Sequence, residues 1–333
     1  MGRTKFACAL GLIAASALPL GANDTFATLA SGGLVPMKTS DIVMQSEDLQ
    51  ISVHEITIHY LFRNTSDRDI DATVAFPLPD LDGGTVYNEP LRLPNEQNPN
   101  FLDFRVTSGG TPISVKANVR AFSEGRDITS RLASFDLPPS VLLAPLNCSL
   151  MKLEPGQRSA LEKEELIVAD GFNPSIPCAG KQGWWATWTM RVGFYWEQRF
   201  PAKGTVDLLQ TYRPVVGGSY IVSGSDGSES ARPYCGGADA LRQIKEFENA
   251  HPAKKDWDPA LIENRIEYIL TTANNWSGPI GNFYLSILAD TPQDIVLTCM
   301  PGLKRVTPVR YELNRSNFHP DQELKLLILQ LAR

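Results

Sequence analysis

Every even-numbered residue from Trp184 to Trp196 is apolar, and this pattern constrains the fold more than any other feature of the chain. The odd positions, from Trp185 to Arg199, include the polar or charged residues Thr187, Thr189, Arg191, Glu197 and Arg199. Side chains alternate between the two faces of a β-strand, so such a segment has one buried face and one solvated face. That arrangement is typical of an antiparallel sheet that covers a core on one side. We therefore predict a mainly β fold with antiparallel β-sandwich-like units.

Other segments also have strand character. Residues 49–62 are rich in β-branched and aromatic side chains and end at the turn signal Asn64-Thr65-Ser66-Asp67. The chain then returns through residues 70–76, and so short a polar link between two strands predicts a hairpin. Further strands are predicted at 101–107, 112–122, 203–213, 282–288, 294–299, 304–312 and 324–331. The sequence Gly278-Pro279-Ile280-Gly281 is interpreted as a turn into the strand at 282–288.

Helices are predicted in two parts of the chain. Asp258-Pro259 resembles a helix start, and the apolar stripe after it completes a helix pair over 239–273. A helix over 155–166 and a short one from Asp127 predict a helical insertion. The expected regions are an N-terminal β-sandwich-like region at 23–125, the insertion at 126–180 and a C-terminal β-rich region at 181–333 with the helix pair. Flexible stretches are expected at 88–100 and 217–237.

The N-terminus has the pattern of a secretory signal. Arg3 and Lys5 precede an uncharged apolar run from Phe6 to Leu20, and small residues follow it. The run is too short for a membrane span, which needs about 20 apolar residues. We predict cleavage after Ala22, so that residues 1–22 are a signal peptide and the mature chain is periplasmic or secreted and does not span the membrane.

Cleavage after Ala22 removes two positive charges and takes the net charge from −6 to −8. The sequence has no cluster of lysines and arginines of the kind that nucleic-acid binding requires. The charge balance therefore predicts no nucleic-acid partner.

Four cysteines remain after Cys8 leaves with the signal. In an oxidising compartment they are expected to form two disulfides. Three pairings are open, and we predict Cys148–Cys178 and Cys235–Cys299 because these close the shortest loops. In the loop-entropy model each closure stabilises the fold by about 3–4 kcal/mol. A metal site is the alternative, but no pair has CxxC spacing.

No catalytic, cofactor-binding or metal-ligating residue is predicted. The histidines are His54, His59, His251 and His319. His54 and His59 are five apart on one predicted strand, so they face opposite sides and do not hold a metal together. No Gly-x-Ser-x-Gly elbow accompanies them. Asp80 and Asp82 flank a turn that could bind a cation loosely, although a solvated turn is the favoured interpretation because other calcium ligands are missing.

Aromatic side chains crowd the segment 184–196. Trp184, Trp188 and Trp196 share its apolar face, which favours core packing. Trp185 and Tyr195 lie on the polar face instead. These two are weak candidates for binding a sugar or another partner.

The segment Val74-Ala75-Phe76-Pro77-Leu78-Pro79-Asp80 ends a strand with two prolines, which cannot donate to a central ladder. Over residues 42–87, this ending and the strand before it resemble the start of the vault and inter-alpha-trypsin inhibitor domain. The mature start Asn23-Asp24, the segments at 44–49, 125–129, 268–272, 275–281, 317–320 and 327–329, and the same proline ending resemble the bacterial domain-of-unknown-function 4424 family of exported proteins. This resemblance implies an exported, mainly β protein and no known activity.

Two hypotheses about function follow. The first is a non-enzymatic envelope interaction or binding protein, since no catalytic constellation is present and the N-terminal part resembles an interaction domain. The alternative is an envelope enzyme that acts on glycans, or a carbohydrate-binding protein, working through exposed aromatic residues. The expected partner is an envelope protein or a glycan, and no cofactor is expected.

Overall fold

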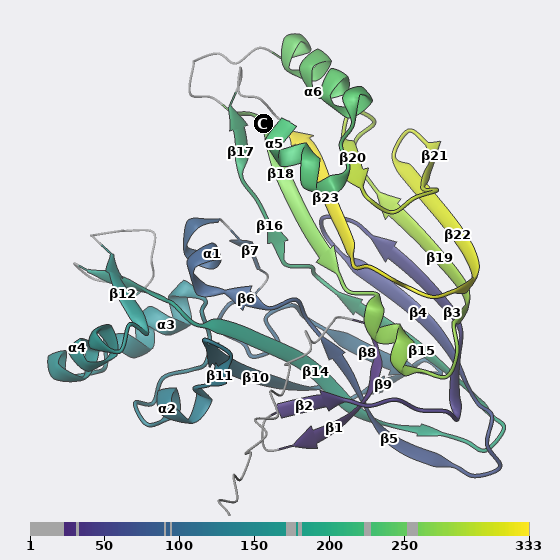
Figure 1. Ribbon diagram of the computed structural model, residues 1–333, viewed down its shortest axis with the longest axis horizontal. Coiled ribbons are helices and arrows are strands. Elements are labelled where there is room, and N and C mark those ends of the chain that lie inside the picture. Colours follow the sequence, from purple (N-terminus) through teal and green to yellow (C-terminus); the bar gives the residue numbers. More distant parts are fainter. Residues whose placement is uncertain are drawn as a thin grey trace, which may run out of the picture.

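The computed structural model describes residues 23–30, 33–89, 91–93, 95–170, 178, 182–222, 228–251 and 259–332. The predicted signal peptide and the predicted N-cap Asp258 lie outside these ranges. The protein is mainly β, and most strands belong to three large sheets (Figure 1).

The first sheet has seven strands in the order β11-β10-β14-β5-β1-β2, with β6 paired to β14. All of its pairings are antiparallel. Its strands are β1 (Thr25–Ala30), β2 (Gly33–Pro36), β5 (Ile70–Pro77), β6 (Leu81–Asp82), β10 (Lys116–Ser123), β11 (Arg126–Asp127) and β14 (Thr189–Phe200). The larger part of the alternating segment is β14, which lies at the centre of this sheet because it pairs with both β5 and β10. The prediction that the segment is one continuous strand is wrong, since residues 187–188 interrupt it and Gly183–Ala186 form β13 in a separate two-stranded sheet.

The second sheet has eight strands in the order β21-β22-β19-β3-β4-β15-β8-β9. Its one parallel pairing joins β3 to β19, which come from opposite ends of the chain. The strands are β3 (Ile42–Ile51), β4 (Ile56–Asn64), β8 (Arg105–Ser108), β9 (Thr111–Ile113), β15 (Thr205–Tyr212), β19 (Ile280–Leu288), β21 (Lys304–Thr307) and β22 (Arg310–Phe318).

The third sheet has six strands in the order β20-β23-β18-β16-β7, with β17 paired to β18. It consists of β7 (Leu91–Arg92), β16 (Val216–Gly217), β17 (Tyr220–Val222), β18 (Pro259–Tyr268), β20 (Ile295–Thr298) and β23 (Leu324–Leu331). A separate two-stranded sheet joins β12 (Ile167–Asp170) to β13 (Gly183–Ala186).

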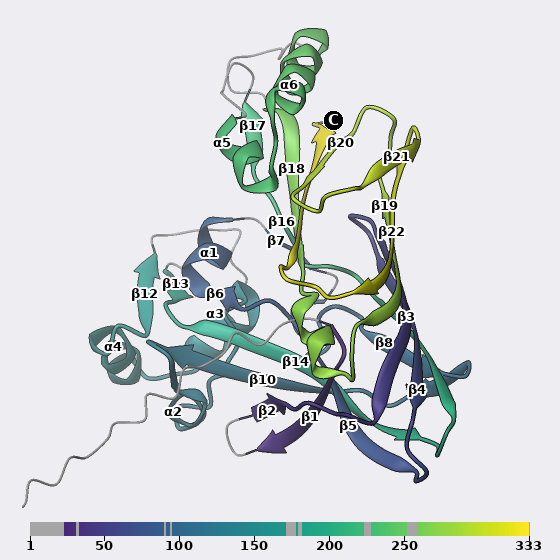
Figure 2. The same cartoon turned by 45° about the vertical axis from the view of Figure 1, so that its right-hand side comes forward.

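Helices lie at two ends of the molecule. The helix α6 (Ala238–Ala250) lies beside the third sheet, whereas α2 (Thr129–Ala133), α3 (Leu143–Leu150) and α4 (Pro155–Lys163) gather near β12, as both views show (Figure 2). The remaining helical segments are α1 (Gly83–Asn88), α5 (Ser228–Ala231) and the 3-10 turns η1 (Arg232–Tyr234) and η2 (Thr271–Asn275). Among the described residues, no helix is both long enough and apolar enough to cross a membrane.

One hydrophobic core joins the three large sheets. Phe62 of β4 meets Phe200 at the end of β14, with ring centroids 6.0 Å apart. Phe104, just before β8, stacks on Phe194 of β14 at 4.7 Å. The side chains of Trp184, Trp188 and Trp196 are buried, as the alternation predicted. The first two sheets therefore pack face to face, and the predicted sandwich-like arrangement is confirmed.

The predicted hairpin between 49–62 and 70–76 is wrong, because β4 and β5 belong to different sheets. After Asn64 the chain crosses from the second sheet to the first, and between Phe200 and Thr205 it crosses back at the same corner. The buried amide of Asn64 donates to the carbonyls of Arg68 and Phe200 at 2.8 and 3.0 Å. A short polar link can turn a corner as well as close a hairpin, and this buried amide satisfies the backbone of the corner.

The segment 49–62 is also two strands. β3 ends at Ile51, and Ser52 accepts hydrogen bonds from the amides of His54 and Glu55 to form a turn before β4. His54 therefore lies in a turn, and the prediction that it shares a strand with His59 is wrong.

The predicted helix over 258–273 is wrong, because residues 259–268 form β18. This strand pairs with β23 in an unbroken antiparallel register from Leu261–Leu331 to Tyr268–Leu324. β23 is buried along most of its length and pairs with β18 on one edge and with β20 on the other. The buried polar residues Glu263 and Asn264 interrupt the alternation of β18 and hid it from sequence analysis. The helix pair is thus reduced to α6.

Most other predicted elements are present. The predicted strands at 101–107, 203–213, 282–288, 294–299 and 324–331 correspond to β8, β15, β19, β20 and β23. The segments 112–122 and 304–312 each fall on two strands. The helices predicted over 155–166 and from Asp127 correspond to α4 and α2, and the sequence missed α1 and α3.

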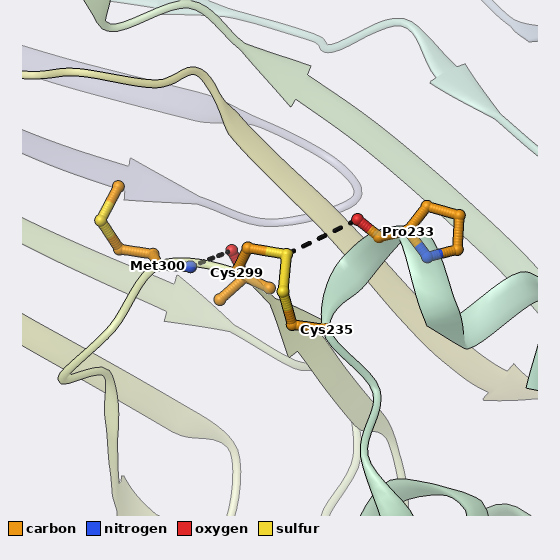
Figure 3. The surroundings of a disulfide bond; sticks show 5 residues. Pro233, Cys235, Cys299 and Met300 are labelled. Atoms are coloured by element: carbon orange, nitrogen blue, oxygen red, sulfur yellow. Dashed lines mark hydrogen bonds between the residues drawn. A yellow bond between two sulfur atoms is a disulfide. The ribbon is translucent and has the colours of Figure 1, made fainter.

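Both predicted disulfides are confirmed. Cys148–Cys178 and Cys235–Cys299 close loops with sequence separations of 30 and 64 residues. The second bond ties the turn η1 to the end of β20, and its Cys299 sulfur lies 3.6 Å from the carbonyl oxygen of Pro233 (Figure 3). This crosslink fixes the position of Tyr234, which is next to Cys235.

Substitution of Asn64 tests how the chain is held where it passes from the second sheet to the first. Asn64→Ala removes two buried donors and leaves the carbonyl of Phe200 without this partner, so we expect the free energy of unfolding to fall by about 2–3 kcal/mol. Urea denaturation followed by tryptophan fluorescence measures the change. Asn314→Ala, on the exposed part of β22, is the control and should change stability by less than about 0.5 kcal/mol. Equal effects of the two substitutions would show that Asn64 does not hold the corner.

Candidate functional site

A cleft of about 340 Å³ opens where the proline-terminated strand β5 comes close to the third sheet. This volume lies within the usual range of small-molecule sites. Its lining is largely apolar, with charged residues added to it. The lining residues are Leu78, Pro79, Asp80, Leu81, Asp82, Thr85, Val86, Glu89, Leu91, Leu102, Tyr212, Val215, Gly217, Tyr234, Arg265 and Glu267.

The two prolines determine the first wall of the cleft. Pro77 pairs with Gly193 at the end of β5, and neither Pro77 nor Pro79 has an amide donor. The amide between them, on Leu78, donates to the carbonyl of Val192 at 2.9 Å. The strand therefore ends with its last donor satisfied, and the chain leaves the ladder with Leu78 buried in the cleft wall.

The second wall begins at the helix α1. Asp82 caps this helix, since its carboxylate accepts from the amide and the hydroxyl of Thr85 at 2.9 and 3.2 Å. Gly83 allows a close approach to β13, because a Cβ there would lie 2.1 Å from the carbonyl oxygen of Ala186. The Asp-Gly-Gly sequence after the proline motif thus starts a helix.

The opposite wall comes from the third sheet and η1. Arg265 of β18 donates to the Glu89 carboxylate at 3.2 Å, and its Nε lies 3.7 Å from Glu263, which also accepts from Ser219 at 2.6 Å. Tyr234 is almost fully buried beside this group, and burial raises its pKa to about 12. Tyr234 therefore stays a neutral phenol at physiological pH.

Carboxylates outnumber cations in the lining, with Asp80, Asp82, Glu89 and Glu267 against Arg265. Two of them pair with cations outside the lining. Arg191 forms a two-pronged bond to Asp80 at 3.1 and 3.0 Å, and Lys325 lies 3.0 Å from Glu267. Asp82 is exposed and is balanced only by the start of α1. The cleft thus combines an apolar floor with a weakly acidic rim.

Asp80 and Asp82 lie in the turn that was considered as a loose cation site. Both carboxylates already have protein partners, in the ion pair with Arg191 and in the helix cap. Across the residues that the structure describes, no cluster of three or more His, Cys, Asp or Glu side chains is placed to hold a metal ion.

The two aromatic candidates lie on different sheets. Trp185 of β13 stacks on Tyr87 of α1 with ring centroids 5.3 Å apart. Tyr195 of β14 packs beside Ala27, Leu34 and Ala75, and the Lys116 ammonium lies 5.9 Å from its ring centre. Both side chains are half-buried, and neither lines the cleft.

The histidines are dispersed. His54 lies 2.9 Å from the carboxylate of Asp290, and His59 lies 2.8 Å from that of Asp207. His251 follows α6 and contacts the carbonyl of Phe247 at 3.0 Å, whereas His319 is exposed.

A larger hollow of about 520 Å³ lies beside α6 and is lined mainly by polar groups. Its acidic residues serve the structure of their own loop. Asp294 accepts from the amides of Asp290 and Thr291 at 2.9 and 3.2 Å, and Gln330 donates to both Asp290 and Asp294 at 3.0 Å. The apolar cleft is therefore the better candidate for ligand binding.

A cluster of buried polar side chains lies between β3, β4 and β18. The hydroxyl of Tyr60 donates to Asn23 at 2.6 Å, and Asn23 donates to the Glu47 carboxyl at 3.1 Å. Tyr268 contacts Glu47 at 3.1 Å and Tyr60 at 3.0 Å. Gln210 donates to the carboxyl of Asp24 at 2.6 Å. We refer to Asn23, Asp24, Glu47, Tyr60, Gln210 and Tyr268 as the buried polar cluster.

In the full-length chain, where the nitrogen of Asn23 is a neutral amide, the buried polar cluster favours a protonated Glu47. Two tyrosine hydroxyls supply two protons for three contacts, to Asn23, between the tyrosines, and between Tyr268 and Glu47. A carboxyl proton on Glu47 supplies the third. Burial raises the pKa of Glu47 to about 7 and also raises the pKa of Asp24.

The architecture defines the class of this protein: a mainly β chain with stacked antiparallel sheets, two disulfides and an apolar cleft at their junction. The family described as "Domain of unknown function (DUF4424)" matches residues 22–327, and the chain belongs to this family. The predicted family resemblance is thereby confirmed. The resemblance of residues 42–87 to the vault and inter-alpha-trypsin inhibitor domain stays a prediction.

Solved structures offer looser likenesses. A "putative nutrient binding protein" from Legionella pneumophila aligns over 92% of this chain and 70% of its own, with 16% identity and a TM-score of 0.45. An M1 zinc metallopeptidase from Deinococcus radiodurans aligns over 88% of this chain and 43% of its own, with 8% identity and a TM-score of 0.23. No curated protein sequence matches the chain. Neither structural likeness is close enough to support a function.

Sequence reasoning missed most of the cleft. It singled out Leu78, Asp80 and Asp82 only as part of a turn, and it placed Arg265 and Glu267 on a helix. The sequence offered no local signal at Asn264, because on a helix this residue would lie opposite the apolar stripe, where a polar side chain is expected.

The raised pKa of Glu47 predicts a pH dependence of stability for the full-length chain, in which Asn23 is part of a peptide bond. Between pH 4.5 and about 7 the folded state keeps a proton that the unfolded state releases, so stability falls as pH rises through this range. We expect a loss of about 3 kcal/mol from a shift of this size. Urea denaturation at several pH values measures it.

Glu47→Gln should reduce this dependence, because the amide does not titrate, and the part that comes from the raised pKa of Asp24 should remain. Glu263→Gln, at a buried carboxylate on β18, is the matched control and should retain it. If the free energy of unfolding depends on pH as strongly in Glu47→Gln as in the natural protein, Glu47 is not a source of the pH dependence.

Proposed function

We propose that this protein is an exported, non-enzymatic binding protein of the cell envelope, and that the cleft beside β5 holds its ligand. The observation that carries the proposal is the cleft itself, where buried Leu78, Val86 and Leu102 are surrounded by charged groups on ordered elements. Ligand sites typically have an apolar floor and a small number of polar groups that converge on it.

The leader and the cysteines support export. Arg3 and Lys5, the apolar run to Leu20 and the small residues after it fit a cleaved signal. Two disulfides suit an oxidising compartment such as the periplasm. The family match also begins at residue 22, next to the proposed cut.

The lining selects the chemical class of the ligand. An apolar body would pack on the partly exposed Leu81, Leu91 and Val215, which gains about 25 cal/mol for each Å² of apolar surface removed from water. The excess of carboxylates, with Asp82 exposed at the rim, favours a positively charged group at one end. A cationic amphiphile or an apolar peptide segment with a basic residue meets both requirements.

Glycan binding through Trp185 and Tyr195 is less favoured. Sugar rings stack on open aromatic faces, whereas Trp185 is stacked on Tyr87 and Tyr195 packs against neighbouring side chains. The two residues also lie on separate sheets, so they do not form one platform.

Calorimetry with a matched pair of probes tests the cleft. We expect decylamine to bind and decanoate, which has the same chain length and the opposite charge, to bind at least about tenfold more weakly. Thr85→Trp places a large ring at the exposed rim and should abolish decylamine binding. Asp82→Asn combined with Glu267→Gln should weaken it about tenfold.

The control is Asp207→Asn combined with Glu312→Gln, which removes two carboxylates from the second sheet and should leave the affinity unchanged. Equal binding of the two probes would refute the charge selection. Binding that survives Thr85→Trp would place the ligand elsewhere.

A further inference from the structure

The first residues of the described chain are embedded in the protein. The side chains of Asn23, Asp24 and Thr25 are fully buried. Beyond the contacts with Tyr60 and Glu47, the carbonyl oxygen of Asn23 accepts from Thr272 at 2.9 Å, and that of Asp24 accepts from the Trp276 indole at 2.6 Å. Hydrogen bonds from β4, η2 and Trp276 thus fix Asn23 and Asp24 in place.

The surroundings of these residues are short of positive charge. Asp24 and Glu47 are both fully buried carboxyls, and their hydrogen-bond partners are the neutral groups Asn23, Tyr268 and Gln210. The Oδ1 atom of Asp24 and the Oε1 atom of Gln210 are buried without a hydrogen-bond partner. Among the described residues, no lysine or arginine forms an ion pair with either carboxyl. Buried carboxylates are costly unless a cation pairs with them.

We propose that the α-ammonium of Asn23, released by proteolysis after Ala22, is the buried counter-charge of Asp24 and Glu47. A peptidase adds one water molecule to the Ala22–Asn23 peptide bond, so that Ala22 leaves with a carboxylate and the new amine of Asn23 takes up a proton. Cleavage therefore does more than release the leader, because it creates the one cation that the buried polar cluster needs. The inference rests on the cleavage included in the proposed function.

Covalent geometry supports this assignment. The α-nitrogen of Asn23 belongs to the residue whose own amide touches Glu47 and whose neighbour is Asp24. From standard bond lengths it lies no more than about 8 Å from either carboxyl. Coulomb attraction at such distances is strong where water is excluded. The titratable groups that face Glu47 are Asp24, Tyr60 and Tyr268, with Tyr212 beyond them, and none of these groups can carry a positive charge.

The test compares two exported proteins, both expressed with the full leader. The first has the natural sequence, and the second has two alanines inserted between Ala22 and Asn23, so that the processed chain begins before the buried residues. Intact mass spectrometry defines both N-termini. We expect the natural protein to begin at Asn23 and its folding equilibrium constant at pH 7 to be about 100-fold larger than that of the extended protein.

If the ammonium of Asn23 pairs with Glu47, the difference in stability between the natural and the extended protein depends on Glu47. In a Glu47→Gln background the extension should have a clearly smaller effect, whereas in the matched Glu263→Gln background the full difference should remain. The fall in stability between pH 4.5 and 7 should also be smaller in the processed protein than in the extended one, because the ammonium stabilises the ionised carboxylate.

A second measurement does not require the extended protein to fold. Acetylation of the α-amine by an N-hydroxysuccinimide ester, followed by mass spectrometry, should be at least about tenfold slower in the folded natural protein than in urea. An N-terminus other than Asn23 would refute both the cleavage site and the pairing. A natural protein that begins at Asn23 but has the stability of the extended protein, or an amine that reacts as fast as in urea, would refute the pairing alone.

Discussion

The buried hydrogen bonds among Asn23, Glu47, Tyr60 and Tyr268 are the constraint on which the architecture depends. Glu47 and Tyr60 belong to the second sheet, Tyr268 belongs to the third, and Asn23 precedes the first. Apolar packing alone tolerates small shifts of one sheet over another. Buried, directional hydrogen bonds do not tolerate such shifts, because a misplaced partner leaves a polar group without a hydrogen bond to water or protein. The cluster therefore fixes the three sheets against one another.

The cleft is a consequence of this arrangement. Tyr268 ends β18, and the same strand carries Arg265 and Glu267 into the cleft wall three and one residues earlier. β5 supplies the opposite side through Leu78, which leaves the ladder between two prolines. The Cys235–Cys299 bond then fixes Tyr234 at the rim. Each wall is thus held by a covalent or buried polar link, as a preformed binding site requires.

Local patterns predicted much of the fold, and the errors have specific physical causes. The alternation of β14 and the apolar segments near the C-terminus depend on neighbouring residues and were predicted correctly, whereas the disulfide pairing was predicted from loop length. β18 was assigned to a helix because the burial of Asn264 is satisfied by a carbonyl of β23, more than sixty residues away. The β4–β5 link was assigned to a hairpin because its corner needs Phe200 as an acceptor. No local pattern contains either partner.

The sequence by itself determined that the chain is mainly β, where β14 has its buried face, and which family the chain resembles. These properties follow from side-chain periodicity, composition and short motifs. Only the tertiary structure decided that β3 lies parallel to β19, that residues 259–268 are a strand, and that Leu78, Tyr234 and Arg265 line one cleft. It alone also brought Asn23 to Glu47. The physical reason is that these contacts join residues far apart in the chain, where the partner's identity, and not local periodicity, sets the lowest free energy.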